Sequence, residues 1–293
     1  MIKCNPPATN CAEICLSLHE PHPGENLHAM SKFVHLHVHS QYSILDGQAS
    51  IQRLVDKAMA DGQPGIAVTD HGDMFGIKEF TNYVNKKNSG PKGEIKDLKK
   101  RIAGIESGEI ECEDKEAEIA DCRAKMAEAE SKLFKPIVGC EMYVARRTMD
   151  KKEGKPDQSG YHLIVLAKNE KGYHNLIKLV SHAWTRGYYM RPRTDRSELE
   201  KYHEGLIVCS ACIGGEVPKK IINDQLEEAE EAVRWYKNLF GDDYYLELQR
   251  HKATVPRANH EAYPLQQKAN AKLLELARKY DIKVICSNDV HFV

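Results

Sequence analysis

The chain has 293 residues, of which 41% are hydrophobic and 29% are charged. This composition is ordinary for a globular protein and excludes a wholly disordered or fibrous chain, while no apolar run approaches the roughly 18 residues typical of a membrane helix. The 42 lysines and arginines are balanced by 43 acidic residues, so a role in nucleic-acid binding would need a local basic patch.

The cysteines and the first thirty residues bear on cellular context. Nine cysteines are scattered along the chain, which is a poor basis for a secreted disulfide framework and fits a reducing cytoplasm.

Residues 1–30 contain four prolines and no hydrophobic period. We expect them to be a disordered segment or an extension and not a signal peptide. Met30 directly precedes the first strand-like pattern, so it is a candidate for the natural start.

Short β-branched runs alternate with helical patterns over the rest of the chain. The runs lie at 33–38, 65–69, 137–144, 161–167, 206–209, 244–248 and 283–286, and helix-like stretches lie at 51–60, 174–182, 225–239 and 266–280. Strands separated by helices at this spacing predict βαβ units and a parallel sheet. Seven strands over about 260 residues favour an α/β barrel, although a doubly wound sheet also fits the pattern.

Residues 88–135 interrupt this rhythm with a segment dominated by Lys, Glu and Asp. Apolar residues recur in it at steps of three and four, first at Ile95, Leu98, Ile102 and Ile105, and then at Ile119, Cys122, Met126, Ala129 and Leu133. Each set forms one narrow apolar stripe on a helix. With residues 106–108 as a turn, the segment predicts an inserted antiparallel helical hairpin; a disordered charged loop is the alternative.

Candidate metal ligands begin in the first strand-like run. On a strand, His35, His37 and His39 would point to one face, because side chains alternate. The active end of a barrel is the carboxyl end of its strands, so His37 and His39 would converge near that rim, where Asp46 follows in a loop. A lone core histidine is usually structural, but two in alternation before an acidic loop residue favour a metal site.

Similar residues recur at the ends of later strands. His71 follows the second run, and Glu141 lies inside an apolar strand, where an unpaired carboxylate would be costly. The others are His162 at the head of a strand, Cys209 and Cys212 in a Cys-x-x-Cys pattern, and Asp289 and His291 after the last strand. Each has an ordinary alternative, such as a turn, a surface carboxylate, a redox pair or a loop. One polynuclear metal site at a barrel rim explains all of them together.

These motifs resemble those of the PHP (polymerase and histidinol phosphatase) domain family. The shared motifs are His37-x-His39, Asp70-His71-Gly72, Gly139-x-Glu141, His162 and Asp289-x-His291. The flanking sequences GYYMRPR at 187–193 and SACIGGE at 210–216 are similar to those in the amino-terminal PHP domains of bacterial DNA polymerase III alpha subunits. The resemblance implies that residues 31–293 form a PHP domain, which has a distorted seven-stranded (β/α)7 barrel.

The resemblance also implies a site for up to three divalent metal ions. One ion would take His37, His39, Glu141 and Asp289; a second would share Glu141 and add His162 and Cys212; the third would take Asp46, His71 and His291. Zinc is the expected metal, with manganese, iron and magnesium as alternatives. A thiolate at Cys212, where other members carry histidine, would favour zinc.

The implied activity is metal-dependent phosphoester hydrolysis, as a 3′→5′ exonuclease that trims mispaired DNA ends within a cytoplasmic replicative polymerase. The implied catalytic residues are His37, His39, Glu141, Asp289, His71 and His291, and either His71 or His291 could act as a general acid if the third metal is absent. Arg186, Arg191 and Arg193 are candidates for phosphate contacts, with surface salt bridges as an equal alternative.

The implied partners are DNA, the remainder of the polymerase alpha subunit and other replicase subunits, and no membrane. Two other functions stay open. The domain could be a metal-stabilised structural module that docks subunits of the polymerase without catalysis, because metal binding also stabilises a fold. It could also be a small-molecule phosphatase of the PHP family.

Overall fold

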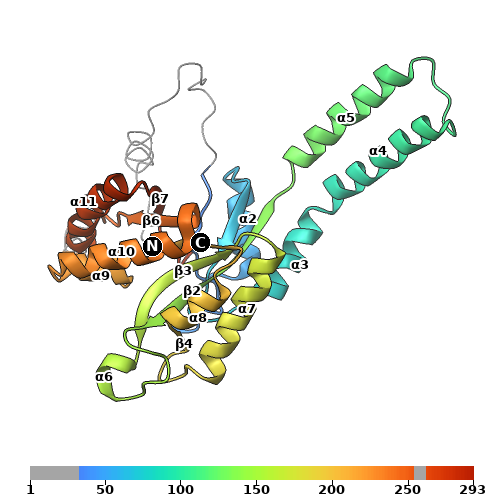
Figure 1. The fold of residues 1–293 in the computed structure, drawn as a ribbon. Coiled ribbons are helices and arrows are strands. Elements are labelled where there is room, and N and C mark those ends of the chain that lie inside the picture. Colours follow the sequence, from blue (N-terminus) through green and yellow to red (C-terminus); the bar gives the residue numbers. More distant parts are fainter. Residues whose placement is uncertain (1–32, 254–261) are drawn as a thin grey trace.

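The computed structural model describes residues 33–253 and 262–293. A curled, mixed sheet lies at the centre, helices flank it, and α4 and α5 extend away from the body (Figure 1). The predicted extension at 1–30 and the candidate start at Met30 lie outside the described residues. Within the described ranges, no helix is long and apolar enough to cross a bilayer.

The helices and strands alternate along most of the chain. The strands are β1 (Gly65–Val68), β2 (Lys135–Ala145), β3 (Gly160–Ala167), β4 (Arg193–Thr194), β5 (Leu206–Cys209), β6 (Tyr244–Gln249) and β7 (Lys283–Ser287). The helices are α2 (Ile51–Ala60), α3 (Ile77–Lys87), α4 (Ser89–Ser107), α5 (Lys115–Ser131), α6 (Gly154–Asp157), α7 (Glu170–Thr185), α8 (Arg196–Tyr202), α9 (Glu216–Ile222), α10 (Leu226–Phe240) and α11 (Ala262–Tyr280), with a 3-10 turn at Gly241–Asp243.

The sheet is mixed, so the prediction of an all-parallel sheet is wrong. Its order is β1-β2-β3-β5-β6-β7, and β4 pairs with β2. β3 runs antiparallel to both β2 and β5, whereas the other pairs are parallel. Because β3 is reversed, its first residues lie beside the carboxyl end of β2, where His162 pairs with Tyr143. A residue that begins β3 therefore reaches the same rim as residues that follow β1.

The segment 33–38, predicted as the first strand, contains no strand. It is nevertheless hydrogen-bonded on two sides. Thr69 N donates to Val38 O at 2.8 Å, and His39 N donates to Val290 O at 2.7 Å. The segment therefore connects the end of β1 with the residues after β7. The seven strands, with β4 among them, form a half-barrel, and a complete (β/α)7 barrel stays a prediction.

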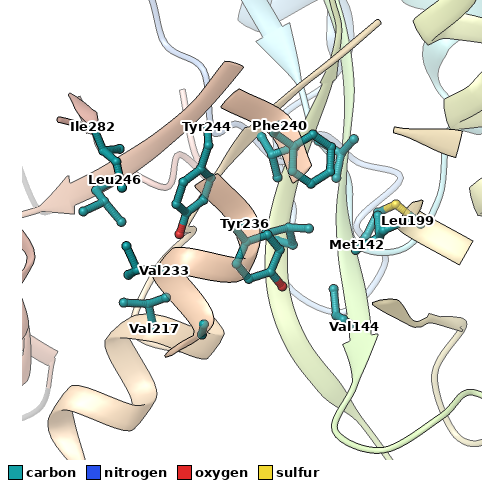
Figure 2. Packing of buried hydrophobic residues seen from close by; sticks show 14 of the residues in the cluster. Met142, Val144, Leu199, Val217, Val233, Tyr236, Phe240, Tyr244, Leu246 and Ile282 are labelled. Carbon is teal, nitrogen blue, oxygen red and sulfur yellow. The ribbon is translucent and has the colours of Figure 1, made fainter. Parts of the chain in front are cut away.

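The largest apolar core lies between the sheet and helices α7 to α11, and Figure 2 shows part of it. Met142 of β2 and Leu246 of β6 are buried in this core with Tyr236 of α10. Successive side chains on a strand point to opposite faces. The neighbouring residues Glu141 and Glu247 therefore point to the other face of the sheet, away from the helices.

The charged segment 88–135 contains two helices, α4 and α5, which lie side by side (Figure 1). α4 ends at Ser107 and is followed by Gly108, which has a left-handed backbone (φ 82°). α5 begins after Asp114, so the connection is longer than the predicted turn. Asn88 joins the two ends of the segment. Its Nδ2 donates to Phe134 O at 2.8 Å, and its Oδ1 accepts from Phe134 N at 2.9 Å. The chain therefore leaves and re-enters the body at one place.

Candidate metal centre

The structure brings all nine predicted ligands together at one rim of the sheet. They come from the extended segment 35–39, the loops after it and after β1, the strands β2 and β3, and the residues after β5 and β7. The members of this cluster are His37, His39, Asp46, His71, Glu141, His162, Cys212, Asp289 and His291. Residues that are up to 254 positions apart thus meet in one cluster.

Glu141 lies at the centre of the cluster and is only 1% exposed. Its Oε1 lies 2.8 Å from His162 Nδ1 and 3.4 Å from His37 Nε2. Its Oε2 lies 3.5 Å from His39 Nε2 and contacts His71 Nδ1. One carboxylate therefore faces four imidazoles, which is the role expected of a ligand shared between two ions.

Asp289 forms the second acidic contact of the inner histidines. Its Oδ1 lies 3.1 Å from His37 Nε2, 3.3 Å from His39 Nε2 and 3.7 Å from His291 Nδ1. The backbone of Asp289 is left-handed, with φ 48°. Residues other than glycine adopt this region at a cost, and such conformations concentrate at functional sites. Here the conformation accompanies a side chain that points at two buried histidines.

The remaining candidates surround this centre. Asp46 Oδ2 lies 3.1 Å from His71 Nε2 and 3.6 Å from His291 Nε2. On the other side, Cys212 Sγ lies 3.6 Å from His162 Nδ1. The division of these residues into three ligand groups stays a prediction. Within the described residues, three sets have ligand atoms within 4.8 Å of one another: His39, His71 and His291; His37, His39 and Glu141; His71, Glu141 and His162.

The donor atoms in the pocket fit divalent cations. Among the described residues, five buried atoms that face one another have no hydrogen-bond partner of acceptable geometry: His37 Nε2, His39 Nε2, His71 Nδ1, Glu141 Oε2 and Asp289 Oδ1. Buried polar atoms without partners are expensive and need an explanation. Imidazole nitrogens and carboxylate oxygens converging in this way are the ligands that zinc and similar ions use.

Hydrogen bonds behind the inner histidines orient their free nitrogens towards the pocket. His37 Nδ1 donates to Glu247 Oε1 at 2.8 Å, and His39 Nδ1 donates to Ser43 Oγ at 2.9 Å. With a proton on each Nδ1, each Nε2 faces Glu141 and Asp289 and is the nitrogen available to a metal ion. Metal-binding histidines generally use their second nitrogen in this way, which fixes the tautomer and the ring.

The electrostatics of the cluster keep its carboxylates charged. Burial alone would raise the pKa of Glu141, but the facing His162 and His37 outweigh it and hold that pKa well below its usual value. Burial also opposes ionisation of Asp289, yet His37 and His39 lower its pKa strongly. The thiol of Cys212 is different, because burial and then Glu141 raise its pKa well above the ordinary value. A cation bound to this sulfur would therefore displace a proton.

Glu247 and Asp70 support the inner histidines, a role that was not predicted from the sequence. Glu247 of β6 is 2% exposed and holds His37. Asp70 accepts hydrogen bonds from Ser40 N at 2.6 Å and from Ser43 Oγ at 2.9 Å, and thereby fixes the loop that supports His39. The role of Glu247 could have been predicted, because Glu247 lies inside an apolar strand as Glu141 does. The role of Asp70 depends on a loop geometry that has no sequence signature.

The predicted phosphate-binding arginines have three different environments. Arg193 is fully buried, and its guanidinium donates to Gly187 O at 3.0 Å and to Met149 O at 2.8 Å, so the prediction that it contacts phosphate is wrong. Arg186 is exposed and pairs with Glu198 at 2.9 Å. Arg191 is half-buried, with its guanidinium carbon 5.9 Å from the centre of the Tyr143 ring. Only the last two remain candidates.

His35 was expected to share a face with His37 and His39, and the structure separates it from them. Its ring packs edge-on against Phe33, with the ring centroids 4.8 Å apart. The prediction assumed a regular strand, and the segment is not one. His35 is therefore not a member of the cluster.

Comparison with known proteins shows which family this chain is similar to. The PHP domain family matches residues 35–251. DNA polymerase III alpha subunits are 38% identical over 264 residues in Borreliella burgdorferi and 37% identical over 266 residues in Treponema pallidum. Each match covers 90% of this chain, but the chain spans only 18% of either relative's length.

A solved structure from Bifidobacterium adolescentis, assigned as a metal-dependent phosphoesterase, is also similar. The two chains are 14% identical with a TM-score of 0.42, and the match covers 89% of this chain and 88% of the other. The family match extends over most of this chain, and its limits include seven of the nine clustered side chains. The chain therefore belongs to the PHP domain family.

Proposed function

We propose that this chain is the PHP domain of a cytoplasmic DNA polymerase III alpha subunit and acts as a metal-dependent 3′→5′ exonuclease on DNA. The domain would span residues 31–293, with 88–135 as an insertion. The observation that carries the proposal is the set of five unpartnered buried atoms that converge around Glu141. The similarity to polymerase alpha subunits supports DNA as the substrate.

The cluster offers three adjoining groups of ligands. His37, His39, Glu141 and Asp289 would hold one ion, Glu141, His162 and Cys212 a second, and Asp46, His71 and His291 a third. Divalent ions bound in this way supply Lewis-acid activation of a phosphate ester and of water. The Cys212 sulfur favours zinc, while the carboxylates and imidazoles also suit manganese and iron.

The burial of the cluster is graded, and this sets the direction from which a substrate would approach. His37 and His39 are buried, while the side chains of His71 and His291 are 19% and 21% exposed and that of Asp46 is 47% exposed. A phosphodiester would therefore enter from the side of Asp46. His71 Nε2 and His291 Nε2 lie on that side, so when the third ion is absent either nitrogen could deliver a proton to the leaving 3′ oxygen.

The test is hydrolysis of DNA by the purified chain. The substrates are a single strand and a primer–template with a mispaired 3′ end, each labelled at the 5′ end, with zinc or manganese added. We expect stepwise shortening from the 3′ end, and its loss in His37→Ala and Asp289→Asn. His174→Ala is the matched control, because this histidine lies exposed on α7. Equal shortening by the parent and by His37→Ala would contradict the proposal.

Two other results would select the alternatives. Metal ions that raise the melting temperature without any hydrolysis would favour the structural and subunit-docking module. Turnover of a small phosphomonoester without any action on DNA would favour the small-molecule phosphatase. Both readings use the same ligand cluster, so only the substrate assay separates them.

A further inference from the structure

Three exposed aromatic side chains lie in a row close to the metal centre. Trp184 and Tyr188, at and just after the end of α7, are 39% and 49% exposed, and Phe75 in the loop after β1 is 56% exposed. The ring centroids of Phe75 and Trp184 lie 5.6 Å apart, and those of Trp184 and Tyr188 are also 5.6 Å apart and nearly parallel. We call these three residues the aromatic strip.

The strip is physically connected to the metal centre. Trp184 Nε1 donates to Gly72 O at 2.8 Å, and Gly72 directly follows His71. A side chain at Gly72 would collide with Pro192 and the Tyr143 ring, so the loop and that ring are in close contact. Tyr143 in turn lies against His71, with the ring centroids 6.1 Å apart. The strip therefore extends outward from the rim of the pocket.

Cationic side chains lie beside the strip. Arg191 lies over the Tyr143 ring. It forms no ion pair with a carboxylate among the described residues. Glu198 pairs with two cationic side chains, Arg186 at 2.9 Å and Lys201 at 3.1 Å. One carboxylate cannot neutralise both cations. A polyanion would therefore meet a favourable field here.

From these contacts we infer that the aromatic strip is the binding platform for the unpaired 3′-terminal nucleotides of single-stranded DNA. Proteins bind single strands by combining exposed aromatic rings, on which bases stack, with cations that follow the backbone. The Trp184 and Tyr188 rings already contact each other, so a base would stack on an outer ring face. This inference rests on the proposed function, because it assigns the part of the DNA that leads into the metal centre.

The experiment measures binding in EDTA, where hydrolysis cannot occur. The chain has two tryptophans, and Trp235→Phe leaves Trp184 as the single emitter. Oligothymidylate added to this parent should quench the fluorescence. We expect Tyr188→Ala to weaken the binding by about 5- to 150-fold, the range that corresponds to removal of one stacking ring. Phe75→Ala is a second variant, and Leu226→Ala, an equally exposed apolar residue on α10, is the control.

Several outcomes would overturn the inference. They are an affinity of Tyr188→Ala equal to that of the parent, an equal loss in Leu226→Ala, binding of blunt duplex as tight as that of oligothymidylate, or no binding at all. The last would assign the strip to a protein contact. Failure of the proposed function is distinguishable. Binding that depends on Tyr188 without any hydrolysis would contradict the nuclease activity and support the role of the strip. Hydrolysis with binding that is independent of Tyr188 would support the nuclease activity and contradict the role of the strip.

Discussion

Replacing Glu247 by glutamine should weaken metal binding without unfolding the protein. Glu247 accepts from His37 Nδ1 at 2.8 Å, and it also accepts from Gln249 Nε2 at 3.0 Å. Glutamine has the same size and can still accept from the histidine through its amide oxygen. What is lost is the negative charge, which favours the Nδ1-protonated ring and increases the basicity of Nε2.

The magnitude follows from this one bond. A hydrogen bond to a charged group contributes about 1.5–3 kcal/mol, roughly twice a neutral one. Glu247→Gln should therefore lose about 1–1.5 kcal/mol, which is roughly a tenfold loss of metal affinity. Glu247→Ala removes the acceptor altogether and should cost up to about 100-fold, the upper range for residues that orient a metal ligand.

The assay is a zinc titration in competition with a chromophoric chelator, with circular dichroism to show that each variant is folded. Glu200→Gln on α8 is the matched control, because it removes the same charge from an exposed position. A Glu247→Gln protein that binds zinc as tightly as the parent, or no more weakly than Glu200→Gln, would refute the reasoning.

Three further outcomes are expected. Protein with metal ion at 100 times the dissociation constant should melt about 5–11 °C higher than protein stripped by a chelator, since such binding stabilises the fold by about 2.7 kcal/mol. Differential scanning fluorimetry would measure the two melting temperatures, and equal values would count against a bound ion. Burial opposes ionisation of Glu198, but His182 and its neighbours lower its pKa, so Glu198→Gln should destabilise the protein by about 1–2 kcal/mol at pH 7. Because a lowered pKa contributes stability that is lost as pH falls, the difference in urea midpoints should vanish in acid, and a difference that stays constant down to pH 3 would be inconsistent with this account. Gly172→Ala would place a Cβ only 1.8 Å from Gly205 O and should lower the free energy of unfolding by about 1–3 kcal/mol. Gly93→Ala on α4 would meet nothing within 4 Å and should raise that free energy by about 0.5–1 kcal/mol. Equal urea midpoints for the two variants would contradict both expectations.

The ligand cluster was predictable because its members have a sequence signature of their own. His37, His39 and Asp289 lie in short motifs at the ends of apolar runs, and chain connectivity brings the ends of neighbouring strands to one edge. His162 was placed correctly in spite of the wrong strand direction. In a parallel sheet it would have lain at the opposite rim, and the antiparallel pairing of β3 brings it beside Tyr143.

The parts that failed depend on contacts that no local pattern encodes. The direction of β3 depends on its pairing with β2 and β5, and its own residues fit either direction. The run at 33–38 has the β-branched and apolar residues of a strand, but it makes only isolated backbone hydrogen bonds to its neighbours. Arg193 has the sequence context of a surface arginine, but it is buried and donates to two backbone carbonyls, Gly187 O and Met149 O, that are distant from any local pattern.

The double hydrogen bond between Asn88 and Phe134 has a consequence for how this chain can change. Because the two ends of the segment already meet, everything between them could be shortened to a tight turn, or exchanged for an unrelated domain, without altering the path of β2 into the pocket. Such a junction tolerates variation in length much better than a loop whose ends lie apart. It is therefore the natural position for grafting a reporter or a fluorescent protein onto this fold.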